Sequence, residues 1–223
     1  MPNHWPALLE AAVSATRKGV RSWIAMAHVQ KASIRGPILT IPRGGLTSAV
    51  QFEGTLLAAL LGAGASPAVA QGWSAAVWGA WRDWYSGWTL VGVLAYPSFA
   101  AFPSSVAPLT PNVPFSVATG RSPFEGSVRD SNLEARIKEK IGGAAKEPGA
   151  AEAVHEFAVW FWNSFQLWHP AATFVNLFGY GPVPSYAPPY VPIGQVVGGS
   201  VMSMPGCIHS GPFGLLPLLR RHR

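Results

Sequence analysis

Residues 66–88, SPAVAQGWSAAVWGAWRDWYSGW, have a counterpart at residues 147–169, EPGAAEAVHEFAVWFWNSFQLWH. The two stretches align at an offset of 81 residues, and the matched pairs include Pro67 with Pro148, Trp81 with Trp162, and Trp84 with Phe165. Each stretch has a proline where a first helical turn would lie, followed by aromatic residues at helical spacing. We interpret them as the long helices of an internal repeat.

The similarity extends to both sides of these helices. Upstream, the apolar positions of a shorter helical segment match: Phe52, Leu56 and Leu60 fall on Leu133, Ile137 and Ile141. Downstream, a run rich in proline follows each long helix and forbids regular helix there. The sequence therefore predicts a mainly α fold with short β segments, built from a duplicated unit of helix, helix and extended arm.

The expected organisation has five parts. They are an N-terminal helix and short strand at 1–46, for which a partial repeat is one interpretation; unit one with its Pro-rich arm at 47–120; a linker at 121–130; unit two with its Pro-rich arm at 131–200; and a Gly-rich basic tail at 201–223.

Start signals mark two of the helices. Ser66 is placed to cap the first long helix and Pro67 to begin it. In the second unit, Ser131 and Glu134 have the spacing of a capping box. The β-branched and apolar run at 89–95 predicts a strand or a continued helix.

The two shorter helices differ in polarity. Two apolar residues of the first copy, Leu57 and Ala59, are lysines in the second. We therefore expect the helix of the first copy to be enclosed on more sides than that of the second.

The composition is poor in charge. Hydrophobic residues make up 49% of the chain, which includes ten Trp, and charged residues only 12%, whereas a typical soluble domain carries about 25%. Residues 157–219 contain no Lys, Arg, Asp or Glu. A surface so poor in charge is expected to contact something other than water. Neighbouring subunits or lipid could provide that contact.

The net charge of +6 is concentrated at the ends of the chain. Residues 1–43 carry six basic residues against Glu10 alone, and the chain ends RRHR. Basic ends could contact nucleic acid or an acidic partner surface, or could simply be solvated and keep an apolar protein soluble.

Membrane insertion is an open alternative. Residues 54–81 carry no charge and exceed the roughly 20 residues of a spanning helix. However, Pro67 interrupts this stretch, and its counterpart in the second unit is rich in charged residues, which are costly in lipid. The N-terminus lacks the order of a signal peptide, so we expect a cytoplasmic assembly or a virion as the location.

The sequence offers little for catalysis. It contains no nucleophile elbow, phosphate-binding loop, dinucleotide fingerprint or zinc-protease motif. Cys207, the one cysteine, and His209 could face one side of a strand, but no second cluster accompanies them, and His155 and His169 belong to the aromatic helix. We expect no enzymatic activity, no cofactor and no metal.

The leading hypothesis is a structural subunit of a large multimeric assembly, such as a virion or a phage-tail-like particle. Its partners would be other copies of the chain and other structural proteins. The alternative is a membrane-associated protein with interfacial Trp-rich helices. The expected core residues are Trp81, Trp84, Trp162 and Phe165, and the expected interface residues are Tyr96, Phe99, Phe102, Phe115, Tyr180, Tyr186 and Tyr190.

Overall fold

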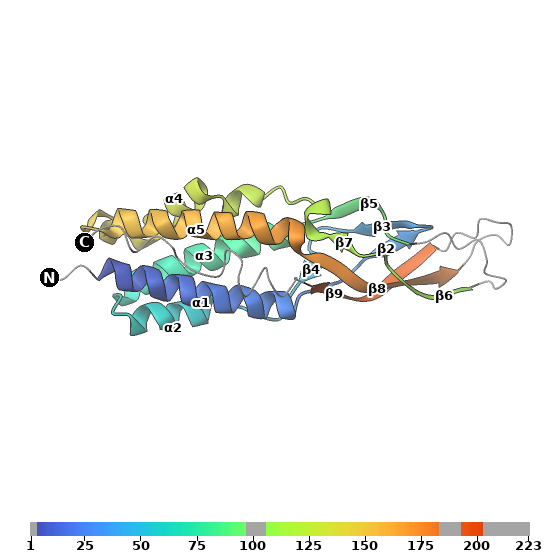
Figure 1. Ribbon diagram of the computed structural model, residues 1–223, viewed down its shortest axis with the longest axis horizontal. Coiled ribbons are helices and arrows are strands. Elements are labelled where there is room, and N and C mark those ends of the chain that lie inside the picture. Colours follow the sequence, from blue (N-terminus) through green and yellow to red (C-terminus); the bar gives the residue numbers. More distant parts are fainter. Residues whose placement is uncertain (1–3, 97–105, 183–192, 203–223) are drawn as a thin grey trace.

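The protein is elongated, with helices in one half and strands in the other (Figure 1). The computed structural model describes residues 4–96, 106–182 and 193–202. We call residues 4–27, 48–87 and 125–171 the helical half, and the other described residues the β half. The mainly α fold with a smaller β part is confirmed.

The described residues form five α-helices, nine strands and three short 3₁₀ helices. The α-helices are α1 (Trp5–Ala25), α2 (Glu53–Gly62), α3 (Pro67–Gly87), α4 (Asp130–Ile141) and α5 (Ala150–Ala171). The strands are β1 (His28–Val29), β2 (Ser33–Arg35), β3 (Ile38–Ile41), β4 (Leu46–Thr47), β5 (Leu90–Leu94), β6 (Val106–Pro111), β7 (Phe115–Ser116), β8 (Thr173–Pro182) and β9 (Ile193–Met202). The 3₁₀ helices are η1 (Val117–Thr119), η2 (Glu125–Val128) and η3 (Gly142–Lys146).

The start of α3 confirms the predicted cap. The Ser66 side chain accepts a hydrogen bond from the Val69 backbone N–H at 3.3 Å, and Pro67 is the first helical residue. The capping box predicted at Ser131 is wrong, because α4 already begins at Asp130. There the Asp130 carboxylate accepts from the backbone N–H of Ser131 instead.

The five helices form a closed ring in which each packs on the next and α5 returns to α1. Aromatic side chains fill the centre of this ring. Trp81 of α3 lies at the middle, with six aromatic rings at centroid distances of 4.9–6.5 Å; they belong to Trp23, Phe52, Trp84, Phe161, Phe165 and Trp168. Tilted and edge-to-face pairs of this kind add attraction beyond the burial of area.

The expectation that the first short helix is more enclosed than the second is wrong. Only Leu56 and Leu60 of α2 are buried, and Leu61 is exposed. Helix α2 lies between α1 and α3, and α4 likewise lies between α3 and α5 and buries three apolar residues despite its lysines. The two helices are therefore enclosed to a similar extent, because each lies between two others in the ring.

The strands pair only in antiparallel fashion and are joined through β9. The order is β4-β1-β9-β2-β3-β5, and β8 extends the network by pairing with β9, β6 and β7. Strands β2, β3 and β5 lie on one side of the β half and β6 and β8 on the other (Figure 1). Core side chains meet between the two sides, where Ile34 and Tyr96 lie 2.9 and 3.0 Å from the position that a Cβ on Gly179 would take.

The order of elements is similar in the two proposed units, although the number of strands and their pairing differ. In each, a short helix precedes a long helix and strands follow: α2, α3, β5, β6 and β7 in the first, and α4, α5, β8 and β9 in the second. Strands β8 and β9 pair with each other, whereas β5 pairs with β3 and β6 pairs with β8.

Helices α3 and α4 approach closely at Gly72. A methyl group on Gly72 would overlap the carbonyl oxygen of Lys140 and lie 2.7 Å from its carbonyl carbon. We expect Gly72→Ala to lower the free energy of unfolding by about 2 kcal/mol, since crowding of backbone cannot relax by a rotamer change. Gly54→Ala is the matched control, because no atom lies within 4 Å of its added methyl group. It should leave stability unchanged or raise it by up to about 1 kcal/mol. Urea unfolding compares the two; equal effects would contradict the close approach.

Candidate functional site: the carboxylate-free β half

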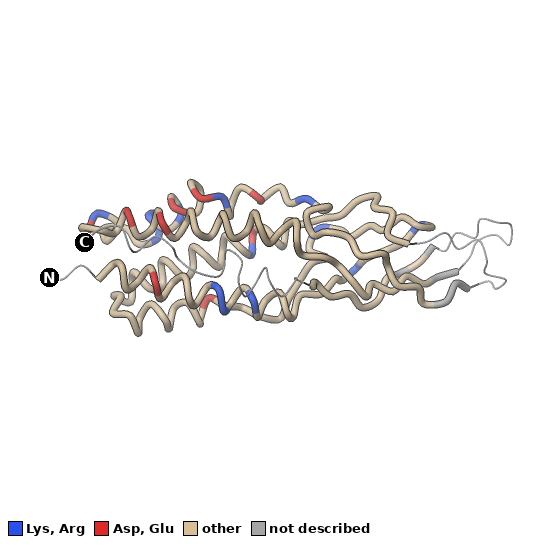
Figure 2. The backbone as a smooth tube through the Cα atoms, viewed as in Figure 1, with Lys and Arg blue, Asp and Glu red and all other residues tan. Residues whose placement is uncertain are grey.

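The acidic residues lie in one half of the molecule, whereas basic residues occur in both (Figure 2). All ten carboxylate side chains of the protein lie in the helical half. The described part of the β half contains no Asp or Glu, and its basic residues are Lys31, Arg35, Arg43 and Arg121. The β half is therefore weakly cationic and otherwise neutral, which suits burial against an uncharged or anionic surface.

One side of the β half exposes large aliphatic residues, which we call the first face: Ile38, Val91 and Leu94. Ile38 of β3 is directly opposite Leu94 of β5, so their side chains share one face of the sheet. Val91 is 76% exposed and Leu94 74% exposed. Aliphatic side chains this open are unusual when they lie next to one another.

A bulge at Gly92 produces this arrangement. Val91 and Gly92 together face a single residue of β3, and Gly92 has a φ of +75°. The extra residue shifts the alternation, so Leu90 and Val93 turn inward while Val91 and Leu94 both turn outward. Without the bulge, one of the two outward residues would point into the core.

The opposite side carries a second apolar row, which we call the second face: Pro111, Phe178 and Val197. They lie opposite one another across β6, β8 and β9, so they share a face. Val197 is 41% exposed, Pro111 is exposed and Phe178 is half-buried. Strands β6, β8 and β9 contain no charged residue.

The strand edges are less available than the faces. Strand β6 carries Pro108 and Pro111, which lack a backbone N–H and do not favour pairing with a further strand. The open edge of β5 is bridged at one end by mutual hydrogen bonds of Thr89 and Arg121, and Val113 N–H donates to the Ala95 carbonyl at the other. The faces are therefore the larger surfaces for a partner.

Of the residues predicted for an interface, one is buried, two are half-buried, and four lie outside the described residues. Tyr96 was expected on the surface, but it is 4% exposed, and its hydroxyl donates to the Leu177 carbonyl at 3.2 Å; burial raises the pKa of this phenol. Phe115 and Tyr180 are half-buried on β7 and β8. Phe99, Phe102, Tyr186 and Tyr190 lie outside the described residues, as do Cys207 and His209.

The four residues predicted for the core all belong to the helical half. Trp81, Trp84 and Phe165 are buried. Trp162 is half-buried, stacks on Phe165 at 5.7 Å and has the guanidinium of Arg129 5.8 Å from its ring centre.

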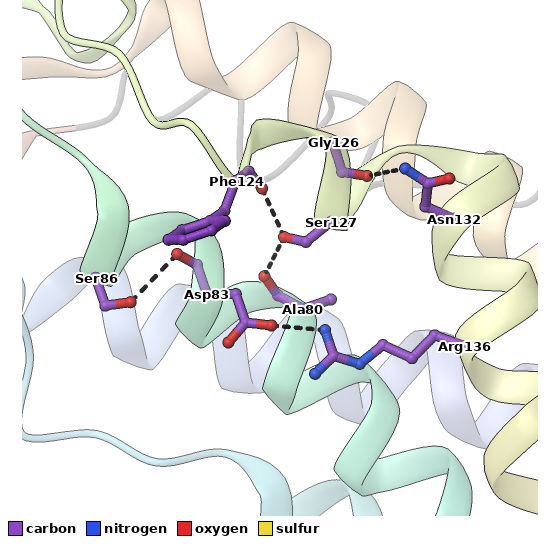
Figure 3. A network of polar contacts seen from close by, with 8 residues as sticks. All are labelled: Ala80, Asp83, Ser86, Phe124, Gly126, Ser127, Asn132 and Arg136. Atoms are coloured by element: carbon purple, nitrogen blue, oxygen red, sulfur yellow. Dashed lines mark hydrogen bonds and ion pairs between the residues drawn. The ribbon is translucent and has the colours of Figure 1, made fainter.

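A polar network fixes α3 to α4 and to η2 (Figure 3). Arg136 forms an ion pair with Asp83 at 2.7 Å. The Ser127 hydroxyl lies 2.8 Å from the Ala80 carbonyl and 2.7 Å from that of Phe124, and donates to one at a time. The Asn132 amide donates to the Gly126 carbonyl at 2.7 Å. The network spans the segment predicted as a linker, which is therefore held against the helices.

His169 lies where α5 meets the β half. Its ring stacks on Phe165 at 4.9 Å and meets the edge of Trp84 at 5.7 Å. Its Nε2 is buried and has no hydrogen-bond partner among the described residues. Burial lowers the pKa of His169 to about 4, so the ring is neutral near pH 7.

His155, by contrast, is exposed and bonds to the Glu134 carboxylate at 2.7 Å. Partial burial acts to raise the pKa of Glu134, but hydrogen bonds from Lys138 and His155 outweigh it and hold the pKa below its usual value. Within the described ranges no three His, Cys, Asp or Glu side chains come together in a group that could hold a metal ion.

The chain matches no protein-family model, and comparison with curated proteins and with solved structures finds no significant match. In the part of the chain that the structure describes, no helix combines the length and the apolar character that crossing a bilayer requires.

Sequence reasoning missed the first and second faces. Their residues lie in strands whose outward direction depends on pairing and on the bulge at Gly92. A glycine inside a short aliphatic strand was the available signal, because such a glycine often marks a bulge.

Proposed function

We propose that the chain is a non-enzymatic structural subunit of a large multimeric assembly, of the kind that forms a virion or a phage-tail-like particle. The observation that carries the proposal is the β half, where aliphatic side chains are exposed on both sides and no described residue bears a carboxylate. Large obligate interfaces are apolar and poor in charge in the same way. The partners are other copies of the chain and other structural proteins.

The helical half suits the role of a rigid support. Aromatic side chains are buried at its centre, and no Lys, Arg, Asp or Glu among the described residues is buried. A subunit of this kind presents its β half to neighbours while the helical half remains solvated. We also propose that the two sets of helix, helix and strands descend from one duplicated unit, which their shared order of elements supports.

Light scattering during size-exclusion chromatography of the full chain tests the assembly. We expect a mass that is a multiple of 23.7 kDa and that rises with protein concentration. Because the contacts are apolar, added salt should not dissociate the particle. A compact monomer at all concentrations would rule the proposal out.

The cationic, aliphatic character of the β half also favours a second candidate, which is binding to a membrane surface. Co-sedimentation with vesicles of anionic and of neutral lipid distinguishes it. The membrane candidate predicts recovery with anionic vesicles that falls as salt is added, whereas the assembly predicts particles without lipid.

A further inference from the structure

We infer that Arg17 and Arg21 of α1 form a binding site for a dianionic phosphate group, held between their two guanidinium groups. The site belongs to the helical half, whereas the first and second faces belong to the β half. The inference goes beyond the proposed function and does not depend on it, because it concerns a ligand of α1 rather than a contact between subunits.

Arg17 and Arg21 differ from the other partly buried cations of the protein. The half-buried Lys and Arg side chains of the described residues are Arg17, Arg21, Arg136 and Lys138. The last two each pair with a carboxylate. The first two form no ion pair and no side-chain hydrogen bond with a described residue. A charge that is partly removed from water is costly unless a counter-charge compensates it, so the pair favours the binding of an anion.

Carboxylates on the same helix and on its two neighbours do not supply this counter-charge. The one acidic residue of α1 is Glu10, which is exposed and lies seven residues before Arg17. Helices α2 and α5 pack against α1, and their acidic residues are Glu53, Glu152 and Glu156. None of these four carboxylates forms an ion pair with Arg17 or Arg21.

The two arginines are placed to act together. They are four residues apart on one helix, so they share a face and their Cβ atoms lie about 5–6 Å apart. Burial lowers the pKa of Arg17, and the nearby positive charge of Arg21 lowers it further. Each Nε is buried without a hydrogen-bond partner, whereas the terminal Nη atoms are not buried and can reach a ligand. An anion between the side chains would relieve their mutual repulsion.

Phosphate suits this pair better than a carboxylate does. Inorganic phosphate or a phosphate monoester carries up to two negative charges near neutral pH and has at least three acceptor oxygens. Each guanidinium donates two parallel N–H bonds to such oxygens in a fixed fork geometry. A carboxylate has a single charge, so it would leave one of the two cations uncompensated.

Calorimetric titration of the full chain with inorganic phosphate tests the site, at about pH 8 where phosphate is mainly a dianion and with chloride keeping the ionic strength constant. We expect one phosphate per chain. Arg17→Gln and Arg21→Gln should each weaken binding about tenfold or more, because each removes charged hydrogen bonds. Lys18→Gln is the matched control, since it removes the same charge from an exposed neighbouring position of α1, and it should bind phosphate like the wild type.

Arg17→Lys and Arg21→Lys keep the charge but lose the fork, so they should bind phosphate more weakly than the wild type and more tightly than the glutamine variants. They also keep the test valid if a glutamine variant fails to fold by circular dichroism. Equal weakening by Lys18→Gln would show a general attraction to a basic helix and would overturn the site.

Three further arms identify the source of the phosphate. Adenosine monophosphate should compete with inorganic phosphate, and adenosine, which lacks the phosphate, should not. A single-stranded oligonucleotide with hydroxyl ends carries only phosphodiesters; binding of this probe without binding of inorganic phosphate would overturn the dianion site in favour of a nucleic-acid contact. Light scattering on the same samples reports the oligomeric state separately, so a monomer that binds phosphate would keep the site and remove the proposed assembly.

Discussion

Replacing Trp81 with alanine is expected to lower the free energy of unfolding by about 4 kcal/mol, since truncating a fully buried aromatic residue typically costs 3–5 kcal/mol. Trp81 is fully buried and touches rings from α1, α3 and α5 as well as Phe52 before α2. No single neighbour can move in to fill the space, because each is itself held by other rings. Urea unfolding followed by circular dichroism measures the loss.

Trp162→Ala is the matched control, since Trp162 aligns with Trp81 in the proposed repeat but is only half-buried. It should cost about 1 kcal/mol, because the truncated ring already faces water on one side. Equal losses in the two variants would contradict the central place of Trp81. Trp81→Phe should fall between them, as it keeps an aromatic ring in the cluster.

Acidification is expected to destabilise the protein through His169. The ordinary pKa of a histidine is 6.5, and burial lowers the pKa of His169 to about 4. Between these values the unfolded chain binds a proton that the folded protein does not, so the free energy of unfolding falls as the pH falls. The contribution of neutral His169 to the free energy of unfolding is fully present above about pH 6.5 and is lost as the pH reaches about 4. Its total is about 3 kcal/mol.

His169→Phe isolates this contribution from the carboxylates, which titrate in the same range. Phenylalanine keeps the stacking on Phe165 and cannot be protonated. The wild type should therefore lose about 3 kcal/mol more than the variant between pH 6.5 and pH 4. Parallel stability curves for the two proteins would show that His169 is not buried in the neutral form.

The helices could be predicted from the sequence because the patterns that specify them are local. The spacing of Trp73, Trp81 and Trp84 predicts a helix with an aromatic stripe, and all three side chains are buried. Ser66 and Pro67 predict the start of α3, and the strand alternative for residues 89–95 matches β5. Each of these features depends on neighbours within a few residues.

Strand pairing could not be predicted from the sequence, because it joins residues far apart in the chain. Residues 97–120 were expected to form an extended arm for contacts with partners, yet the described part, from 106, forms β6, β7 and η1, and both strands pair with β8 of the same chain. Tyr96 was predicted to lie at an interface for a similar reason. Its burial depends on a hydrogen bond from its hydroxyl to the Leu177 carbonyl, 81 residues away in the chain. Proline content marks these segments as non-helical but does not say what they contact.

The position of β9 determines when the sheet can be completed during synthesis. This last described strand lies between β1 and β2, which are made near the beginning of translation. A nascent chain on the ribosome therefore has a gap in its sheet until the C-terminal region emerges, and the ring of helices likewise closes only when α5 reaches α1. Such long-range closure slows folding and leaves apolar surface open in unfinished chains, so truncated products should depend strongly on chaperones.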